Sequence, residues 1–240
     1  RNGNKGAGGG LYFNGAQVTM REVLLLNNAS DGWGGGVYVY SGTVGMKNVL
    51  LAGNVADVNG GGLYVNSGTV NLLNGTLADS VNEGIRQAAG TVNVTNCIVW
   101  HNSVGDIVGT VNASHSNVGD QDYGGDNISA DPLFESGYYL ADGSPSAGAG
   151  SDTATNLGLA AYARNTAGET YGPTDIVNQG WHATVGVLDL YVSADGNDAN
   201  AGTGPGPGDA FRTVSKALAT ARDGTRVNVA TGTYSQAAGE

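Results

Sequence analysis

The chain has 240 residues, of which 42 are glycine, and its 10 Lys and Arg residues against 21 Asp and Glu residues give a formal net charge of −11. This acidic balance, without any basic stripe, excludes a nucleic-acid-binding protein, because the phosphate backbone would repel it. No apolar run approaches the ~20 residues that a membrane-spanning helix needs, so membrane insertion is not expected, and the single cysteine excludes a disulfide framework within the chain.

The first half of the chain repeats itself: Gly-Gly-Gly occurs at residues 8–10, 34–36 and 60–62, at one constant interval. Each triplet precedes an apolar segment with a central tyrosine, namely Leu11-Tyr12-Phe13, Val37-Tyr38-Val39 and Leu63-Tyr64-Val65. A second segment begins at Gln17, Thr43, Thr69, Thr91 and Thr110, so the interval is constant at first and then shortens twice. Such short repeats fit the coils of a solenoid, in which like residues stack on like residues. A leucine-rich repeat, the main rival at this period, would need a fixed Leu/Asn pattern that the chain lacks.

Alternation along each segment assigns its side chains to the inside or the outside of the coil. The predicted interior columns include Val18, Val44, Val70 and Val92, and also Leu25, Leu51, Leu77 and Val99. Cys97 falls in another inward column and is expected to fill the core rather than to act as a nucleophile. At one corner, where we expect left-handed backbone and hydrogen bonds to the neighbouring coil, the aligned residues are Asn28, Asn54, Ser80 and Asn102.

Two outward columns are candidate ligand or partner surfaces. Tyr12, Tyr38 and Tyr64 lie one coil apart, and such a ladder can bind sugar rings, face a partner, or stack on itself. A second column is apolar and contains Leu24, Leu50, Thr76 and Ile98, beside Leu26, Ala52, Ala78 and Trp100. Because contiguous apolar surface is usually covered, we expect either the tail at 150–187 or a neighbouring rod to lie on it.

After residue 113 the repeat weakens, and the sequence becomes typical of the end of a β-helix. The segments are Ser116-Asn117-Val118, Asp126-Asn127-Ile128-Ser129-Ala130-Asp131-Pro132-Leu133-Phe134 and Gly143-Ser144-Pro145-Ser146-Ala147-Gly148. They resemble the C-terminal part of a large family of secreted bacterial proteins with a right-handed parallel β-helix. The resemblance implies an all-β solenoid with coils over residues 1–149, and an extracellular or cell-surface location. It is specific for fold and poor for function, since the same fold hosts adhesins, surface proteins and polysaccharide-active enzymes.

The segment 188–240 resembles the opposite end of the same family, its N-terminal cap and first coil. Apolar residues at a spacing of 3–4 predict one capping helix over 210–222, flanked by strands at 190–192 and 226–230. The residues expected to form a subunit joint are Leu190, Tyr191, Val192, Phe211, Val214, Leu218, Val227 and Val229, with Leu11 and Phe13 on the receiving coil.

The order of these two parts is inverted, with the coils first and the cap last. The cap is expected to cover the first coil of another copy or of an adjacent repeat, head to tail, while a circular permutant and an arbitrary chain boundary remain alternatives. The leading hypothesis is therefore a non-catalytic extracellular filament or a link of a long surface array. The alternative is a carbohydrate-active β-helix, either lyase-like or glycan-binding, with cell-surface glycans as partners and the tyrosine ladder as the platform.

No catalytic motif is present, and no catalytic residue is assigned. Ca²⁺ is the only cofactor for which candidate ligands exist, because it prefers several oxygens on flexible loops. The two oxygen-rich segments contain Asp195, Asn197 and Asp198, and Asp120, Asp122 and Asp126. Asx turns are the alternative explanation for both segments.

Overall fold

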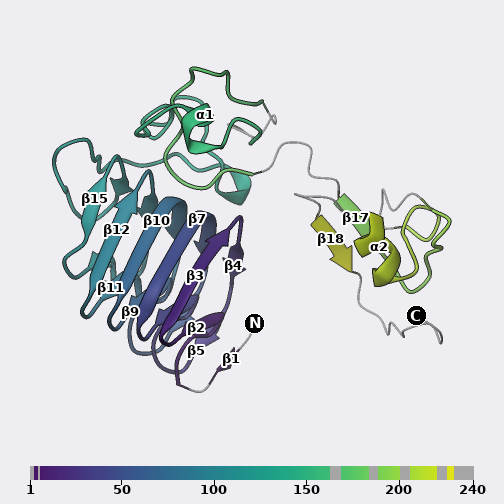
Figure 1. The fold of residues 1–240 in the computed structure, drawn as a ribbon, viewed down its shortest axis with the longest axis horizontal. Coiled ribbons are helices and arrows are strands. Elements are labelled where there is room, and N and C mark those ends of the chain that lie inside the picture. Colours follow the sequence, from purple (N-terminus) through teal and green to yellow (C-terminus); the bar gives the residue numbers. More distant parts are fainter. Residues whose placement is uncertain are drawn as a thin grey trace. The chain divides into compact units, whose positions relative to one another are not determined.

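The computed structural model describes residues 3–4, 6–162, 169–183, 189–200, 206–220 and 226–229. The chain divides into two compact units, Arg1–Ala183 and Thr184–Glu240, and each unit is described by itself (Figure 1). Among the described residues, no helix is long and apolar enough to cross a membrane.

The first unit is a parallel β-solenoid of about four turns, which confirms the predicted fold class (Figure 1). One sheet stacks β2 (Leu11–Phe13), β6 (Val37–Val39), β9 (Leu63–Val65), β11 (Glu83–Gln87) and β14 (Gly105–Val108). The larger sheet stacks β3 (Ala16–Arg21) and β4 (Leu24–Leu26), β7 (Gly42–Ala52), β10 (Thr69–Ala78), β12 (Thr91–Thr95) and β13 (Ile98–Trp100), and β15 (Asn112–Ser114) and β16 (Asn117–Val118). A short third sheet holds β1 (Gly3–Asn4), β5 (Ala29–Ser30) and β8 (Val55–Ala56).

We number the coils by these strands: the first coil holds β2, β3 and β4, the second β6 and β7, and the third β9 and β10. The fourth holds β11, β12 and β13. The observed register is the one that the repeats predict, since Leu11 pairs with Val37, Val37 with Leu63, and Leu63 with Ile85, all in parallel. The shorter spacing along the chain keeps the register, because β12 pairs with β15 through Asn93 and Asn112.

The glycine triplets are explained by close approach of backbone from neighbouring coils. A Cβ on Gly35 would lie 2.4 Å from the carbonyl oxygen of Val55, closer than any side chain tolerates. Gly34, the first residue of the same triplet, has φ of 66°, a left-handed conformation that glycine adopts without strain. The triplet therefore permits a tight corner at which successive coils nearly touch.

The inward columns form one core along the coils. Val44, Val70 and Val92 are 0% exposed, as are Leu51, Leu77 and Val99 in the second predicted column. Cys97 is fully buried, and burial raises the pKa of its thiol to about 12, so it is packed as a small apolar residue. Burial of these apolar side chains stabilises the coils by about 25 cal/mol per Å² of surface removed from water.

The corner prediction is half right. Asn54 Oδ1 accepts a hydrogen bond from the backbone N–H of Asn28, and Asn102 Oδ1 accepts one from that of Ser80, so the ladder between coils exists. The left-handed residues, however, lie one position earlier: Asn27, Gly53, Asp79 and His101 all have positive φ. The turn is made by the earlier residue because the ladder residue must aim its side chain at backbone of the adjacent coil.

The last coil is closed by the loops that follow it. The backbone N–H of Val118 donates to the carbonyl of Ile128, and Asn117 Nδ2 donates to the carbonyl of Ala130 and to Ser146 Oγ. Two short helices in this part of the chain, the 3₁₀ helix η1 (Ser136–Tyr138) and α1 (Ala154–Leu157), were not expected from the sequence.

The second unit contains two parallel strands with a helix between them in sequence. β17 (Asp189–Val192) pairs with β18 (Arg226–Val229), and α2 spans Val214–Thr220. The predicted start at residue 210 is wrong: Thr213 Oγ1 accepts a hydrogen bond from the backbone N–H of Lys216, which places Thr213 at the N-cap. Residues 221–222, the end of the predicted helix, lie outside the described residues.

Candidate assembly surface

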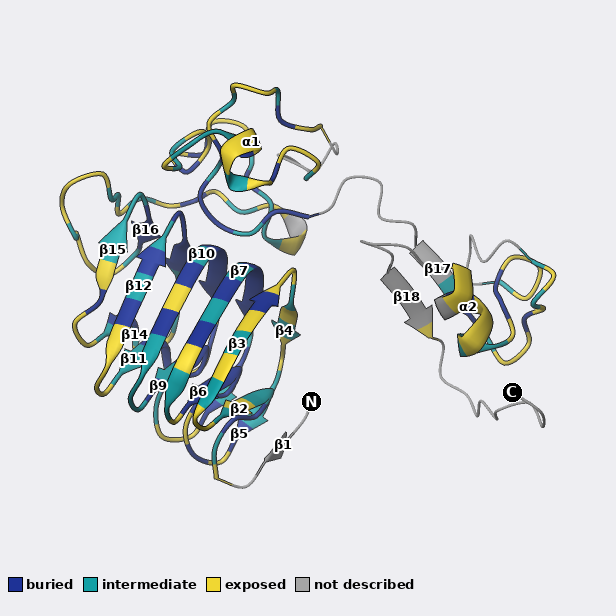
Figure 2. Cartoon of the chain, viewed as in Figure 1, coloured by how far each residue is buried: buried dark blue, intermediate teal, exposed yellow. Residues whose placement is uncertain are grey.

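The first coil exposes apolar side chains that the second coil buries. Leu11, Phe13, Val18, Val23 and Leu25 are half-buried, whereas their counterparts one coil on are 0% exposed: Val37, Val39, Val44, Val49 and Leu51. Figure 2 shows this difference as intermediate and exposed colours on β3 and β4 beside the buried stripes of β7.

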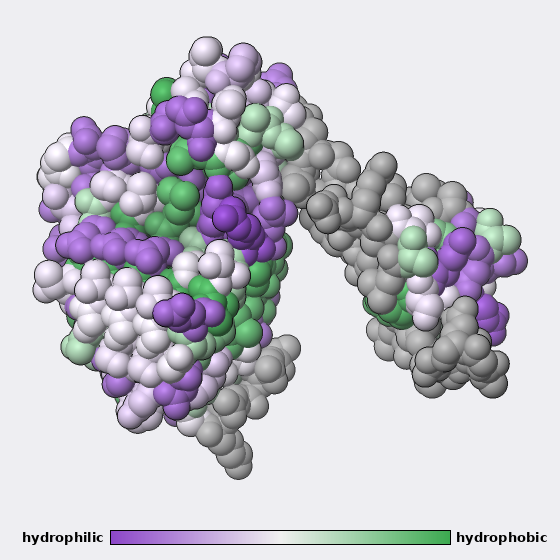
Figure 3. Space-filling view, viewed as in Figure 1, coloured by the Kyte–Doolittle hydropathy of each residue, from purple (hydrophilic) through white to green (hydrophobic). Residues whose placement is uncertain are grey.

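The outward leucines of β4 extend this apolar end. Leu24 and Leu26 are each 44% exposed, and Figure 3 shows hydrophobic atoms gathered along this edge of the first unit. The larger sheet also carries an outward row of polar side chains, since Asn93 donates a hydrogen bond to Asn71 and Asn112 donates one to Asn93.

In the described part of the chain, the first coil is an outermost layer of the two larger sheets. Within the described strands, β2 pairs with β6, and β3 pairs with β7, each on one side. A free strand edge beside exposed core residues is a surface that native proteins cover. The first-coil end is therefore the candidate assembly surface, and we call it the open end; Leu11 and Phe13, the predicted receiving residues, belong to it.

The described part of the second unit buries some apolar side chains and exposes another. Val192 and Phe211 are each 1% exposed and form a bridge, Tyr191 and Val214 are half-buried, and Val229 is 49% exposed. The side chains of the remaining predicted joint residues, Leu190, Leu218 and Val227, lie outside the described residues. Phe211 and Val192 therefore pack inside the unit, while Val229 leaves an apolar side chain on its strand β18 available.

The tyrosine ladder forms as predicted and its rings contact one another. The ring centroids of Tyr12 and Tyr38 are 5.3 Å apart and those of Tyr38 and Tyr64 are 5.1 Å apart, in tilted contacts. Tyr38 is only 7% exposed, and burial together with the neighbouring tyrosines raises the pKa of its hydroxyl. The ring of Tyr38 thus packs against the rings of Tyr12 and Tyr64, and little of its surface is accessible for stacking on a sugar.

The ladder is wider than the sequence indicated. Trp33 contacts Tyr64 at 6.3 Å and Tyr40 contacts Tyr38 at 6.3 Å, so five rings form one cluster. Tyr12, Trp33 and Tyr40 are the exposed members, at 47%, 40% and 45%. Trp33 was missed because it lies on the corner before the glycine triplet, where no repeat of an aromatic residue drew attention to it.

The second outward column is covered over most of its length. Leu50, Thr76 and Ile98 are at most 3% exposed and Trp100 is half-buried, whereas Leu24 and Leu26 at the first coil are exposed. Residues 178–182 lie on this column: the backbone N–H of Trp181 donates to Thr76 Oγ1, and a Cβ on Gly180 would touch Ile98. The cover is thus supplied by the chain's own segment, which we call the tail and define as residues 151–183.

Three asparagines in successive coils hold the tail. Asn48 exchanges two hydrogen bonds with the backbone of His182, each 2.8 Å long, Asn74 donates to the carbonyl of Asn178, and Asn96 bonds both the backbone N–H and the hydroxyl of Ser151. All three have positive φ. The sequence carried a signal for them, an Asn at the same place in three successive repeats, although nothing in it indicated which segment they would bind.

In the two oxygen-rich loops, most of the named side-chain oxygens accept hydrogen bonds from the chain itself. Asp198 accepts hydrogen bonds from the backbone N–H groups of Arg212 and Thr213 and from Thr213 Oγ1, and Asn197 Oδ1 accepts one from the N–H of Ala199. Asp195, beside them, is exposed. Asp120 accepts a hydrogen bond from the N–H of Asp106, Asp122 accepts one from the N–H of Gly124, and Asp126 contacts His115.

In the described part of the chain no three His, Cys, Asp or Glu side chains converge on a metal position. These contacts favour the Asx-turn alternative, and Ca²⁺ binding stays a prediction.

The side chains of His101 and Asp79 form a hydrogen-bonded pair at the left-handed corner of two successive coils. His101 Nδ1 is 2.7 Å from Asp79 Oδ1, and this hydrogen bond raises the pKa of the imidazole. The hydroxyl of Tyr138 donates to the other oxygen of Asp79, which ties the hairpin around η1 to the coils. Both His101 and Asp79 are exposed. The pair thus belongs to a surface contact that joins the corner of two coils to the segment around η1.

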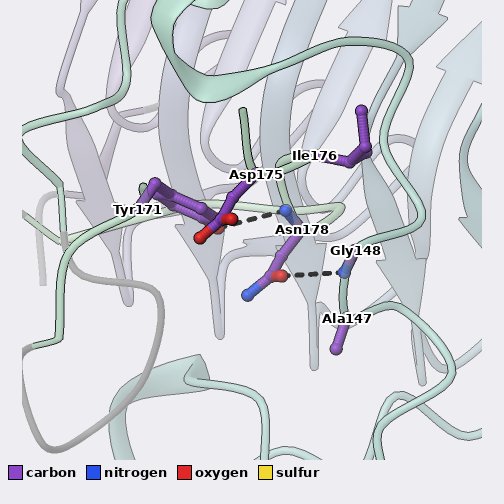
Figure 4. Close-up of a pocket in the computed structure, with 6 residues that line it drawn as sticks. All are labelled: Ala147, Gly148, Tyr171, Asp175, Ile176 and Asn178. Carbon is purple, nitrogen blue, oxygen red and sulfur yellow. Dashed lines mark hydrogen bonds between the residues drawn. The ribbon is translucent and has the colours of Figure 1, made fainter. Parts of the chain in front are cut away.

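A shallow pocket of about 340 Å³ lies within the folded tail (Figure 4). Its lining includes Ala147, Gly148, Tyr171, Asp175, Ile176 and Asn178. The Tyr171 hydroxyl accepts a hydrogen bond from the backbone N–H of Asn178, and Asn178 Oδ1 accepts one from Gly148, as Figure 4 shows. The first bond lies within the tail and the second joins the tail to the loop before it, so the pocket reflects how the tail folds.

Comparison with known proteins reaches only the end of the chain. A family model described as a protein of unknown function, DUF1565, matches residues 194–240, which is 47 of the 240 residues. That family is associated with parallel β-helix proteins, in agreement with the fold. No curated protein and no solved structure matches the chain significantly.

Proposed function

We propose that the chain is an extracellular structural β-helix protein whose copies join head to tail, in a filament or as links of a long surface array. The second unit of one copy covers the open end of the next copy. In this proposal the protein acts as a structural element. The repeated coils make each copy stiff, and the second unit connects one copy to the next.

One observation carries the proposal: the five half-buried apolar residues of the first coil stand against five fully buried counterparts one coil further on. An apolar coil end with free strand edges needs a cover. The match of residues 194–240 to a β-helix-associated family supports the second unit as that cover. A contact between two unlike surfaces does not close on itself, so it extends into an array.

Deletion of residues 184–240 is expected to abolish assembly and to expose the open end. Sedimentation and electron microscopy of the shortened chain should show monomers only, and binding of the dye ANS should rise because the apolar first coil is uncovered. Phe211→Ala, which removes a buried ring of the second unit, is the matched variant that leaves the chain length intact. Filaments that persist after the deletion would falsify the proposal.

A glycan-binding surface is the second candidate, and the exposed rings of Tyr12, Trp33 and Tyr40 favour it. Trp33→Ala is expected to weaken binding to a glycan array by about 5- to 150-fold if this cluster is a platform, because losing one aromatic stacking contact costs about 1–3 kcal/mol. Tyr38→Phe, which keeps the buried ring, is the control. Absence of glycan binding and of lyase activity with Ca²⁺ in the unaltered protein would exclude this second candidate.

A further inference from the structure

The chain contains several Asn-Gly pairs, a dipeptide in which the asparagine side chain can react with the neighbouring backbone. The glycine nitrogen can attack the side-chain amide carbon and close a five-membered ring, and glycine, which has no Cβ, hinders this approach least. Pairs in which both residues are described lie at 14–15, 59–60 and 74–75. Because the dipeptide is the same in all three, a large difference in reactivity between them reports the fold.

The pair Asn14-Gly15 lies in the turn between β2 and β3, at the open end. Both residues are exposed, and a Cβ added to Gly15 would meet no atom within 4 Å. The other two pairs are more enclosed, since a Cβ on Gly60 would lie 2.7 Å from the Cβ of Tyr64 and Asn74 is 0% exposed. The first pair therefore offers more room for water to enter and for ammonia to leave.

One hydroxyl contacts both reacting groups of the exposed pair. Ser41, at the corresponding turn of the second coil, accepts a hydrogen bond from the Gly15 N–H at 2.8 Å and donates one to Asn14 Oδ1 at 3.0 Å. The backbone carbonyl of Ser41 accepts from the same N–H at 3.1 Å, which holds the glycine nitrogen beside the hydroxyl. The hydroxyl is thus placed to take the proton of the attacking nitrogen and to stabilise the charge that develops on the amide oxygen.

The glycines of the two enclosed pairs contact different groups. The Gly60 N–H donates to Glu83 Oε2 at 2.7 Å, and an ionised carboxylate has no proton to give to an amide oxygen. The Gly75 N–H donates to Cys97 Sγ, whose own proton is donated to the carbonyl of Thr95. Neither partner therefore donates a hydrogen bond to the amide oxygen of its asparagine, as the hydroxyl at the exposed pair does.

We propose that Asn14 is a self-modification site, which converts to aspartate or isoaspartate with the help of the Ser41 hydroxyl. The Gly15 nitrogen bonds to Asn14 Cγ, the Cγ–Nδ2 bond breaks, and ammonia leaves with the proton that the hydroxyl relays from the nitrogen. Water then opens the succinimide ring at either carbonyl, so the net reaction consumes water and releases ammonia. The product carries a new carboxylate on the turn between two strands of the open end, and this inference does not depend on the proposed function.

Ageing of the folded protein, followed by protease digestion and mass spectrometry, measures the conversion of each pair separately. We expect Asn14 to convert at least about tenfold faster than Asn59 or Asn74, because a positioned proton donor and acceptor contributes at least this much. In urea, where the fold is lost, the three rates should become similar. A folded chain in which Asn14 converts no faster than the two enclosed asparagines overturns the proposal.

Two variants of Ser41 separate the role of the hydroxyl from the effect of exposure alone. Ser41→Ala removes both side-chain contacts and should slow the conversion of Asn14 at least about tenfold, whereas Ser41→Thr keeps a hydroxyl and should retain most of the rate. Ser67→Ala is the matched control, because Ser67 Oγ donates to the carbonyl of Tyr40 and touches no Asn-Gly pair, so the rate at Asn14 should stay unchanged. Conversion in Ser41→Ala that is as fast as in the unaltered protein, or faster, also overturns the proposal.

Discussion

Replacing Leu51 with alanine is expected to lower the free energy of unfolding by about 2–5 kcal/mol, the cost of a cavity in a packed core. Leu51 is 0% exposed and stacks between Leu25 in the first coil and Leu77 in the third. The surrounding coils are held by parallel strand pairing on both sides, so the cavity has little freedom to collapse. Urea denaturation of the two proteins at one low concentration measures the difference.

Leu25→Ala is the matched variant, because Leu25 is the same residue type in the same column, half-buried at the open end. At low protein concentration it should cost about half as much as Leu51→Ala or less, since fewer packing contacts are lost. At concentrations where copies assemble, the cost should rise toward that of Leu51→Ala, because a partner that covers the open end stabilises only the folded chain. Equal costs for the two variants at every concentration would contradict an open end.

Acidification is expected to destabilise the docked tail through His182. This imidazole is 3% exposed, and burial lowers its pKa from 6.5 to about 4, an effect that a nearby backbone carbonyl, Gly180, only partly opposes. Its Nε2 is 2.6 Å from the hydroxyl of Tyr171, and the coil residue bonded to its backbone, Asn48, is uncharged. Neither of these two hydrogen-bond partners carries a charge that would offset the cost of a buried imidazolium.

The direction follows from proton binding. With the tail released, His182 takes up a proton below about pH 6.5, whereas the docked state takes it up only near pH 4. The stabilising contribution is complete above pH 6.5 and is lost as the pH falls to 4, and the total loss is about 3 kcal/mol. Unfolding free energies between pH 7.5 and 4.5 should fall more steeply in the unaltered protein than in His182→Gln. His101→Gln is the contrasting control, because the Asp79 hydrogen bond raises the pKa of His101 and reverses the sign. Parallel pH profiles for the unaltered protein and His182→Gln would exclude this role.

The coils could be predicted from the sequence because each repeat constrains the next. The pairing of Leu11 with Val37 and of Val37 with Leu63 follows from a period that the glycine triplets mark. The local errors arise where two residues share one corner or one helix start. The left-handed turn lies at Asn27 rather than Asn28, and the helix begins after Thr213 rather than at residue 210.

The tail contacts could not be predicted, for a physical reason. Asn48, Asn74 and Asn96 repeat along the coils, whereas their partners Ser151, Asn178 and His182 occur once each and follow no period. A single docked segment is specified by shape and by backbone groups, and these leave little trace in residue types. The wider aromatic cluster escaped for a similar reason, since Trp33 and Tyr40 join it from corners.

The shortening of the coils gives the rod a direction of taper. The chain takes more residues to pass from Leu11 to its partner Val37 than from Asn93 to its partner Asn112, so the perimeter shrinks along the axis. The first coil of one copy and the last coil of another therefore contain different numbers of residues per turn. If these two coils stacked directly on each other, their strands would not align. In the proposed head-to-tail array, a second unit with its own short sheet of β17 and β18 would lie between two coils of unequal perimeter, and every added copy would point in the same direction.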